Sequence, residues 1–127
     1  MSKICSLRGI SAPQLTPFRE DGSINYGEYT RLTQFITDAG VHGVFVCGTT
    51  GEFVNLTLEE RKRLLTAAVE GAGPESCILF NTTAMNLADM KELGPDEERF
   101  HREVGTFIGG MPVDEVITLG ELGAAIA

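Results

Sequence analysis

Residues 40–60 read GVHGVFVCGTTGEFVNLTLEE and decide how the rest of the chain is interpreted. The apolar run Val41–Cys47 predicts a buried strand. The turn Gly48–Gly51 follows directly and displays the hydroxyls of Thr49 and Thr50 together with several N–H groups. In parallel α/β folds, small anionic ligands bind at the C-terminal ends of strands. The sequence therefore predicts a carboxylate-binding turn at Thr49 and Thr50.

Strands and helices alternate along the chain and predict four βα units. The first helix is expected after Asn25, with Tyr29, Leu32, Phe35 and Ile36 along one face. A capping box at Thr57-Leu58-Glu59-Glu60 opens the second helix, which closes near Gly71, and Pro95 opens the third. Further strands are expected at residues 9–15, 77–82 and 113–119, and a last helix at residues 121–127.

This alternation implies a parallel sheet joined by right-handed crossovers. An open three-layer sheet of the flavodoxin or Rossmann type is favoured, because it covers both sheet faces within one α/β domain of 127 residues. The alternative is half of a TIM barrel that forms a homodimer through its open strand edges, since a complete barrel needs roughly 250 residues.

Composition excludes several classes of function. Eighteen acidic residues against ten basic ones give a net charge of −8, which opposes binding to nucleic acid and to anionic membranes. No apolar run approaches the roughly 20 residues of a membrane span, so a cytoplasmic protein is expected. Cys47 and Cys77 are expected to be buried free thiols. With two histidines and no Cys-x-x-Cys spacing, neither a metal nor a cofactor is expected.

Residues 8–90 carry a first family pattern. The matching stretches are Thr16-Pro17-Phe18 with Asp21-Gly22, GVHGVFVCGTTGEFVNLTLEER at 40–61, and ILFNTTAMNLADM at 78–90. They resemble the N-terminal part of the dihydrodipicolinate synthase / N-acetylneuraminate lyase family, which are pyruvate-dependent class I aldolases built on a TIM barrel. The resemblance implies that Thr49 supplies a hydroxyl of the proton relay and that Thr50 helps hold the pyruvate carboxylate.

Residues 89–127 carry a second pattern. The run DMKELGPDEERFHREVGTFIGGMPVDEVITLGELGAAIA is similar to the C-terminal Rossmann-like domain of a Mur ligase, UDP-MurNAc-tripeptide–D-alanyl-D-alanine ligase. The two patterns overlap at Asp89–Leu93. We therefore predict a chimera, with residues 1–90 lyase-like and 91–127 ligase-like. A designed, de novo origin is favoured, and a natural gene fusion is the alternative.

Neither chemistry is expected to survive. A class I aldolase needs a desolvated lysine that forms a Schiff base with pyruvate. Lys3 is expected in the N-terminal tail, Lys62 on the exposed side of a helix and Lys91 in a loop, while Tyr26 and Tyr29 both belong to the first helix. The resemblance implies that the family's own lysine and tyrosine come later in the barrel. The ligase's phosphate-binding loop has no counterpart, since no G-x-x-x-x-G-K-[ST] occurs.

The leading functional hypothesis is thus a non-catalytic scaffold. The alternative is a residual binding module, or lyase fragment, that holds pyruvate or another 2-oxo acid weakly at Thr49 and Thr50. Against it stands a tight turn whose threonine hydroxyls bond to local backbone. Asp89, Glu92 and His101 are interpreted as polar loop and helix-flank residues rather than as a metal or acid–base site.

Overall fold

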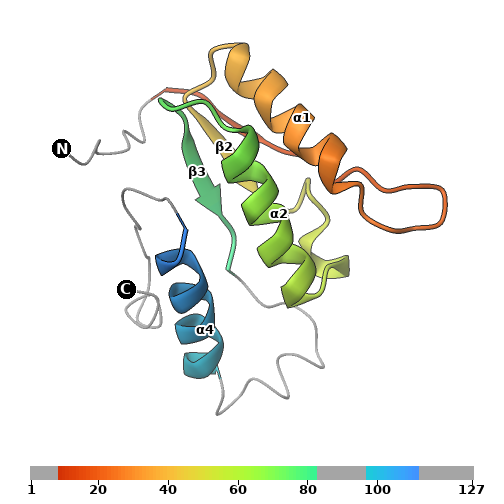
Figure 1. The fold of residues 1–127 in the computed structure, drawn as a ribbon, viewed down its shortest axis with the longest axis vertical. Coiled ribbons are helices and arrows are strands. Elements are labelled where there is room, and N and C mark those ends of the chain that lie inside the picture. The colour runs from red at the N-terminus through yellow and green to blue at the C-terminus, as the bar shows by residue number, and fades with distance from the viewer. Residues whose placement is uncertain (1–8, 83–96, 112–127) are drawn as a thin grey trace. The chain divides into compact units, whose positions relative to one another are not determined.

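The computed structural model describes residues 9–82 and 97–111 (Figure 1). Contacts divide the chain into two compact units, Cys5–Asn81 and a second made of Thr82–Ala127 with Met1–Ile4. The first unit contains, in order, β1 (Ser11–Pro13), α1 (Tyr26–Asp38), β2 (Gly43–Val46), the 3-10 turn η1 (Phe53–Asn55), α2 (Leu58–Gly71) and β3 (Cys77–Phe80). The described part of the second unit is α4 (Glu97–Gly109).

The three strands form one parallel sheet in the order β1-β2-β3. Val44 of β2 lies opposite Ala12 on one side and Ile78 on the other, and Val46 lies opposite Phe80. The first three predicted strands are confirmed at shorter lengths. The predicted fourth strand, residues 113–119, and the last helix, residues 121–127, lie outside the described residues.

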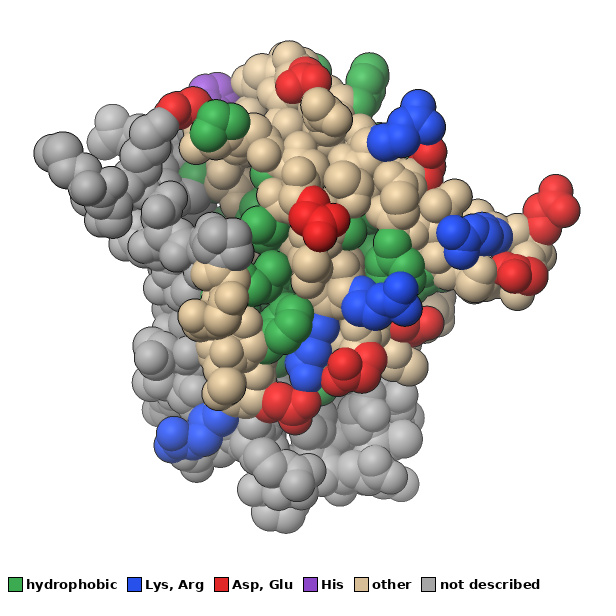
Figure 2. All heavy atoms as spheres, in the orientation of Figure 1, with side chains coloured by type: hydrophobic (Ala, Val, Ile, Leu, Met, Phe, Trp, Pro, Cys, Tyr) green, Lys and Arg blue, Asp and Glu red, His purple; other side chains and the backbone are tan. Residues whose placement is uncertain are grey.

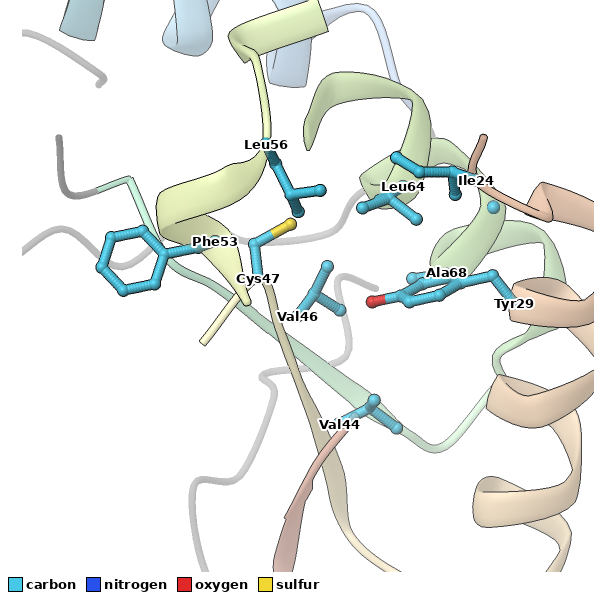
Figure 3. Close-up of a cluster of buried hydrophobic side chains, with 10 residues drawn as sticks. Ile24, Tyr29, Val44, Val46, Cys47, Phe53, Leu56, Leu64 and Ala68 are labelled. Carbon is cyan, nitrogen blue, oxygen red and sulfur yellow. The ribbon is translucent and has the colours of Figure 1, made fainter. Parts of the chain in front are cut away.

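Both helices of the first unit pack on the same face of the sheet (Figures 1 and 3). Val44 and Val46 are fully buried there against Tyr29 of α1 and against Leu64 and Ala68 of α2. The open parallel sheet is confirmed, but the predicted second helical layer is not found in residues 9–82. Strands added in one direction through right-handed crossovers place every helix on one face, whereas a three-layer sheet needs the strand order to reverse.

The other face of the sheet is only partly covered within the described residues. Pro13, Phe45 and Leu79 lie side by side on it, in register across the three strands. Phe45 is 37% exposed, and Leu15, just beyond β1, is 60% exposed. This face is the one that a closed barrel would enclose.

Local sequence signals set the helix ends. The Thr57 hydroxyl accepts a hydrogen bond from the Glu60 N–H at 3.3 Å, and the Glu60 carboxylate accepts one from the Thr57 N–H at 2.8 Å, so the predicted capping box is confirmed. Asn25 caps α1 by accepting from the N–H of Glu28 at 3.2 Å. In α4, Val104 is buried and the helix ends at Gly109.

The buried face of α1 differs from the predicted stripe. Phe35 is 72% exposed, and Thr33 is fully buried instead. The Thr33 hydroxyl lies 2.9 Å from Gln14 Oε1 and 3.0 Å from the carbonyl oxygen of Tyr29. Gln14, also fully buried, donates from Nε2 to the same carbonyl at 3.0 Å. A polar contact between the end of β1 and α1 thus fixes how the helix is rotated, and this leaves Phe35 in solvent.

No helix in the two described ranges is long and apolar enough to cross a membrane.

Replacing Gln14 by alanine is expected to lower the free energy of unfolding by about 2–3 kcal/mol, because it leaves buried polar groups unpaired and opens a small void. Urea denaturation followed by circular dichroism measures this. Gln34→Ala, on the exposed side of α1, is the control and should change stability by no more than about 0.5 kcal/mol. Equal effects of the two substitutions would contradict the role given to Gln14.

Candidate carboxylate-binding turn

The turn after β2 depends on an unusual backbone conformation at Cys47. Its φ of 56° lies in the left-handed region, which residues other than glycine rarely adopt. Gly48 follows with its Cα against the Phe45 ring, where a Cβ would meet ring carbons at 2.7–2.8 Å. A side chain at residue 48 would therefore require the Phe45 ring to move.

Hydrogen bonds to carbonyl oxygens hold the turn. The Glu52 N–H donates to the carbonyl of Thr49 at 3.0 Å, and the Phe53 N–H donates to that of Gly48 at 3.4 Å. The buried Thr16 hydroxyl donates to the carbonyl of Gly51 at 2.7 Å. Thr16 belongs to the predicted Thr-Pro-Phe motif, and the structure brings it to the predicted turn.

The donors of the turn remain available. Thr49 and Thr50 are exposed, and within residues 9–82 and 97–111 their hydroxyls make no hydrogen bond. The N–H groups of Gly48–Gly51 likewise have no acceptor among these residues. The two hydroxyls therefore do not bond to the local backbone, as one of the two interpretations of this turn required. At the carboxyl end of a parallel strand, the exposed residues Thr49 and Thr50 present unbonded hydroxyls and N–H groups, and the buried Gly48 and Gly51 flank them.

Asn81, directly after β3, joins this turn to the neighbouring strand. Its N–H donates to the carbonyl of Val46 at 3.1 Å, and its side-chain Nδ2 donates to the carbonyl of Cys47 at 2.9 Å. The Asn81 carbonyl in turn accepts from the guanidinium of Arg61 on α2. Asn81 therefore ties together the ends of two strands and one helix.

Sequence reasoning missed Arg61. The side chain is buried, at 5% exposure, with its guanidinium carbon 5.5 Å from the centre of the Phe53 ring and 5.9 Å from that of Phe80. Its position was available in the sequence, since residue 61 stands three and four places before Leu64 and Leu65 on the inward stripe of α2. An arginine in such a stripe requires buried partners.

Cys47 and Tyr29 lie in the core behind the turn (Figure 3). Burial raises the pKa of the Cys47 thiol from 9.0 to about 11, and the nearby Arg61 acts in the opposite direction. Burial also raises the pKa of the Tyr29 hydroxyl, which has no hydrogen-bond partner in the described structure. Both groups are neutral at pH 7.

The lysine prediction needs one correction. Lys62 is buried, at 8% exposure, rather than on the exposed side of its helix. Its Nζ forms a salt bridge with Glu59 Oε1 at 3.0 Å, one turn earlier in α2. The amine is therefore engaged by a carboxylate of its own helix. Lys3 and Lys91 lie outside the described residues.

Both tyrosine side chains pack against other parts of the protein. Tyr29 is enclosed in the core, and the ring of Tyr26 lies under the guanidinium of Arg63 at 3.9 Å. Both belong to α1, as predicted.

Three other predicted features are placed only in part. Asp89 and Glu92 lie outside the described residues, as does the side chain of His101. Cys47 is a free thiol, as expected, but Cys77 is disulfide-bonded, so the expectation of a free thiol is wrong there. Within the described ranges, no group of three or more His, Cys, Asp or Glu side chains could hold a metal ion.

The helix-covered face carries charges of both signs. Figure 2 shows acidic and basic side chains interspersed over it, with no concentration of Lys and Arg among its described residues. This face has no single-sign surface of the kind that binds polyanions.

Consecutive βα units with their helices on one face, and a donor-rich turn at the carboxyl end of β2, define the opening part of a parallel βα barrel. The family model described as the Dihydrodipicolinate synthetase family matches residues 6–100. The chain belongs to this family.

Relatives of known sequence agree with this assignment. An uncharacterized DapA-like lyase of Pyrococcus horikoshii is 38% identical over 96 residues, covering 71% of this chain and 33% of the relative. A 4-hydroxy-tetrahydrodipicolinate synthase of Stenotrophomonas maltophilia is 40% identical over 77 residues, covering 61% and 26%. The chain spans about a third of the length of the curated relatives it matches.

Solved structures give the same result. The Proteus mirabilis N-acetylneuraminate lyase is similar with a TM-score of 0.66 and 28% identity, over 84% of this chain and 32% of that one. A 2-keto-3-deoxygluconate aldolase variant of Sulfolobus solfataricus, solved as a pyruvate complex, is similar with a TM-score of 0.61 and 26% identity, over 79% and 31%.

The family match extends beyond the predicted seam at Asp89–Leu93 and ends at residue 100. None of these relatives is a Mur ligase. Nothing supports the predicted resemblance of residues 89–127 to a Mur ligase. The prediction of a chimera, which depended on that resemblance, is without support as well.

Stability is expected to fall by about 1.4 kcal/mol per pH unit as pH rises from 9 towards 11, because the unfolded Cys47 thiol loses its proton while the folded one keeps it. Below pH 9 this contribution is fully present. Urea denaturation at intervals between pH 8.5 and 10 measures the slope, and Cys47→Ala should flatten it. A wild-type curve no steeper than that of the variant would show that the thiol titrates normally.

Proposed function

We propose that this chain is a lyase-family fragment that binds small carboxylates such as pyruvate or another 2-oxo acid at the turn Gly48–Gly51. The observation that carries the proposal is the set of unbonded donors on the two exposed residues of this turn, the N–H groups and hydroxyls of Thr49 and Thr50. Adjacent N–H and O–H donors suit a planar anion with several acceptor positions. The pyruvate complex of the related Sulfolobus aldolase supports this choice of ligand.

The affinity follows from the surroundings of the turn. Thr49 and Thr50 are exposed, so a carboxylate exchanges hydrogen bonds with water for similar ones with protein. Glu52 is also exposed and stands directly after the turn, where its negative charge opposes an anion. A dissociation constant of about 1 mM is expected for such a carboxylate.

We propose further that this chain does not itself catalyse carbon–carbon bond cleavage or formation. Family membership favours a natural lyase fragment over a designed scaffold without a ligand. Lys62, the lysine whose position is described, is held in a salt bridge on α2. Pairing of two copies through the sheet edges remains a prediction, tested by sedimentation at several concentrations.

In an NMR titration, pyruvate at millimolar concentrations is expected to shift the amide resonances of Thr49, Thr50 and Gly51. Thr50→Val removes one hydroxyl at nearly constant shape and should weaken binding about fivefold, since a hydrogen bond to a charged group is lost. Thr37→Val, on α1, is the matched control and should bind as the wild type does. Pyruvamide, which lacks the negative charge, should shift none of these amides. A turn that shows no shift with pyruvate would end the proposal.

Incubation with pyruvate and borohydride, followed by intact-mass measurement, is expected to leave the mass unchanged. The reason is that aldolase chemistry needs a neutral lysine beside the bound carbonyl group, whereas the described lysine, Lys62, forms a salt bridge with Glu59 on α2. A full-length lyase of the family serves as the positive control. A stable pyruvyl adduct on any lysine of this chain would show that it retains the first step of aldolase chemistry.

A further inference from the structure

We infer that Arg61 is the positioning residue of the carboxylate-binding turn, and that it acts through the backbone of Asn81. The inference rests on the proposed function and adds to it the group that holds the donors in place. Arg61 lies on α2, whereas the donors of Gly48–Gly51 follow β2. The contacts between them pass through buried and half-buried groups and do not involve any exposed side chain.

The first contact fixes the pivot of the turn. Asn81 donates twice to the end of β2, from its N–H to the carbonyl of Val46 and from its side-chain amide to that of Cys47. The second of these carbonyls belongs to Cys47, the residue in the left-handed conformation, whose backbone strain must be offset by its surroundings. Asn81 therefore stabilises the bend that displays Thr49 and Thr50.

The second contact fixes Asn81. The Arg61 guanidinium donates to the Asn81 carbonyl, and its carbon lies over the rings of Phe53 and Phe80, at 5.5 and 5.9 Å from their centres. Phe53 follows the turn, and Phe80 precedes Asn81. A single planar cation thus contacts the segment after the turn and the strand end beside it. A hydrogen bond from a charged donor is roughly twice as strong as a neutral one, and stronger still where water is excluded.

The burial of Arg61 supports a specific task. Removing a cation from water is unfavourable unless hydrogen bonds and ring faces compensate for it. An apolar side chain at this place in the stripe would pack against Leu64 and Leu65 without that cost. A lysine has the charge but neither the planar surface nor the fixed fork of donors. The geometry therefore depends on the guanidinium shape as well as on its charge.

Two variants and one control test this inference with the full chain and pyruvate as the probe. Arg61→Met is expected to raise the dissociation constant about tenfold, because the turn is then in its binding conformation for a smaller fraction of the time. The dissociation constant of Arg61→Lys should lie within about twofold of that of Arg61→Met, because lysine keeps the charge but not the forked set of N–H donors. Arg63→Met is the matched control, since Arg63 lies on the same helix and contacts the Tyr26 ring instead. It should bind pyruvate as the wild type does.

Asn81→Ala removes the side-chain bond to Cys47 and keeps Arg61, so it tests the inference even where Arg61→Met does not fold. It is expected to weaken binding to a similar extent. The dissociation constant of the double variant, Arg61→Met with Asn81→Ala, should lie within about twofold of that of the weaker-binding single variant, because the two residues act in series. Full additivity, or a folded Arg61→Met that binds normally, would show that Arg61 only contributes to stability.

A measurement without ligand separates this inference from the proposed function. In Arg61→Met, the Asn81 N–H is expected to exchange with solvent about tenfold faster than in Arg63→Met, because its segment is less firmly held. Cys47 alkylation should also shift to higher pH, since Arg61 no longer opposes the effect of burial on the thiol pKa. If wild type does not bind pyruvate but both changes appear, the proposed ligand is wrong and the positioning role stands. If neither appears, the inference fails.

Discussion

The handedness of the strand–helix–strand connection is the constraint on which this structure depends. A right-handed crossover between neighbouring parallel strands places its helix on a fixed face of the sheet. Because β1, β2 and β3 follow one another in one direction, α1 and α2 both lie over the face formed by Val44 and Val46. The carboxyl ends of β2 and β3 then lie side by side, so Asn81 reaches the backbone of Cys47 although 34 residues separate them.

Features set by nearest neighbours could be predicted from the sequence. The capping box at Thr57 and the cap at Asn25 each need partners only three residues away, and both form as expected. The strand order could not be predicted in this way. The same alternation of strands and helices serves an open three-layer sheet and a barrel, because the difference lies in which strands pair and not in any one βα unit.

Burial along the helices was predicted less well, for a related reason. Helical periodicity marks a stripe but does not fix its edges, and a polar contact from elsewhere in the chain decides them. Gln14 selects Thr33 rather than Phe35 for the core, across 19 residues. Arg61 was overlooked because charged residues are assigned to the surface by default, although its place in the stripe of α2 indicated burial.

The turn itself could be predicted from the sequence, but the residues that hold it in place could not. Thr49 and Thr50 could be found from the sequence because a glycine-flanked pair of hydroxyls directly follows an apolar strand. Their support comes from Thr16, Asn81 and Arg61, which the fold alone brings together. Binding a carboxylate needs only donors that are already in place, whereas aldol chemistry also needs a neutral amine beside them. The described residues provide the donors, and the amine of Lys62 forms a salt bridge within α2. Membership of a lyase family therefore determines the shape of this site, while its chemistry depends on which groups surround it.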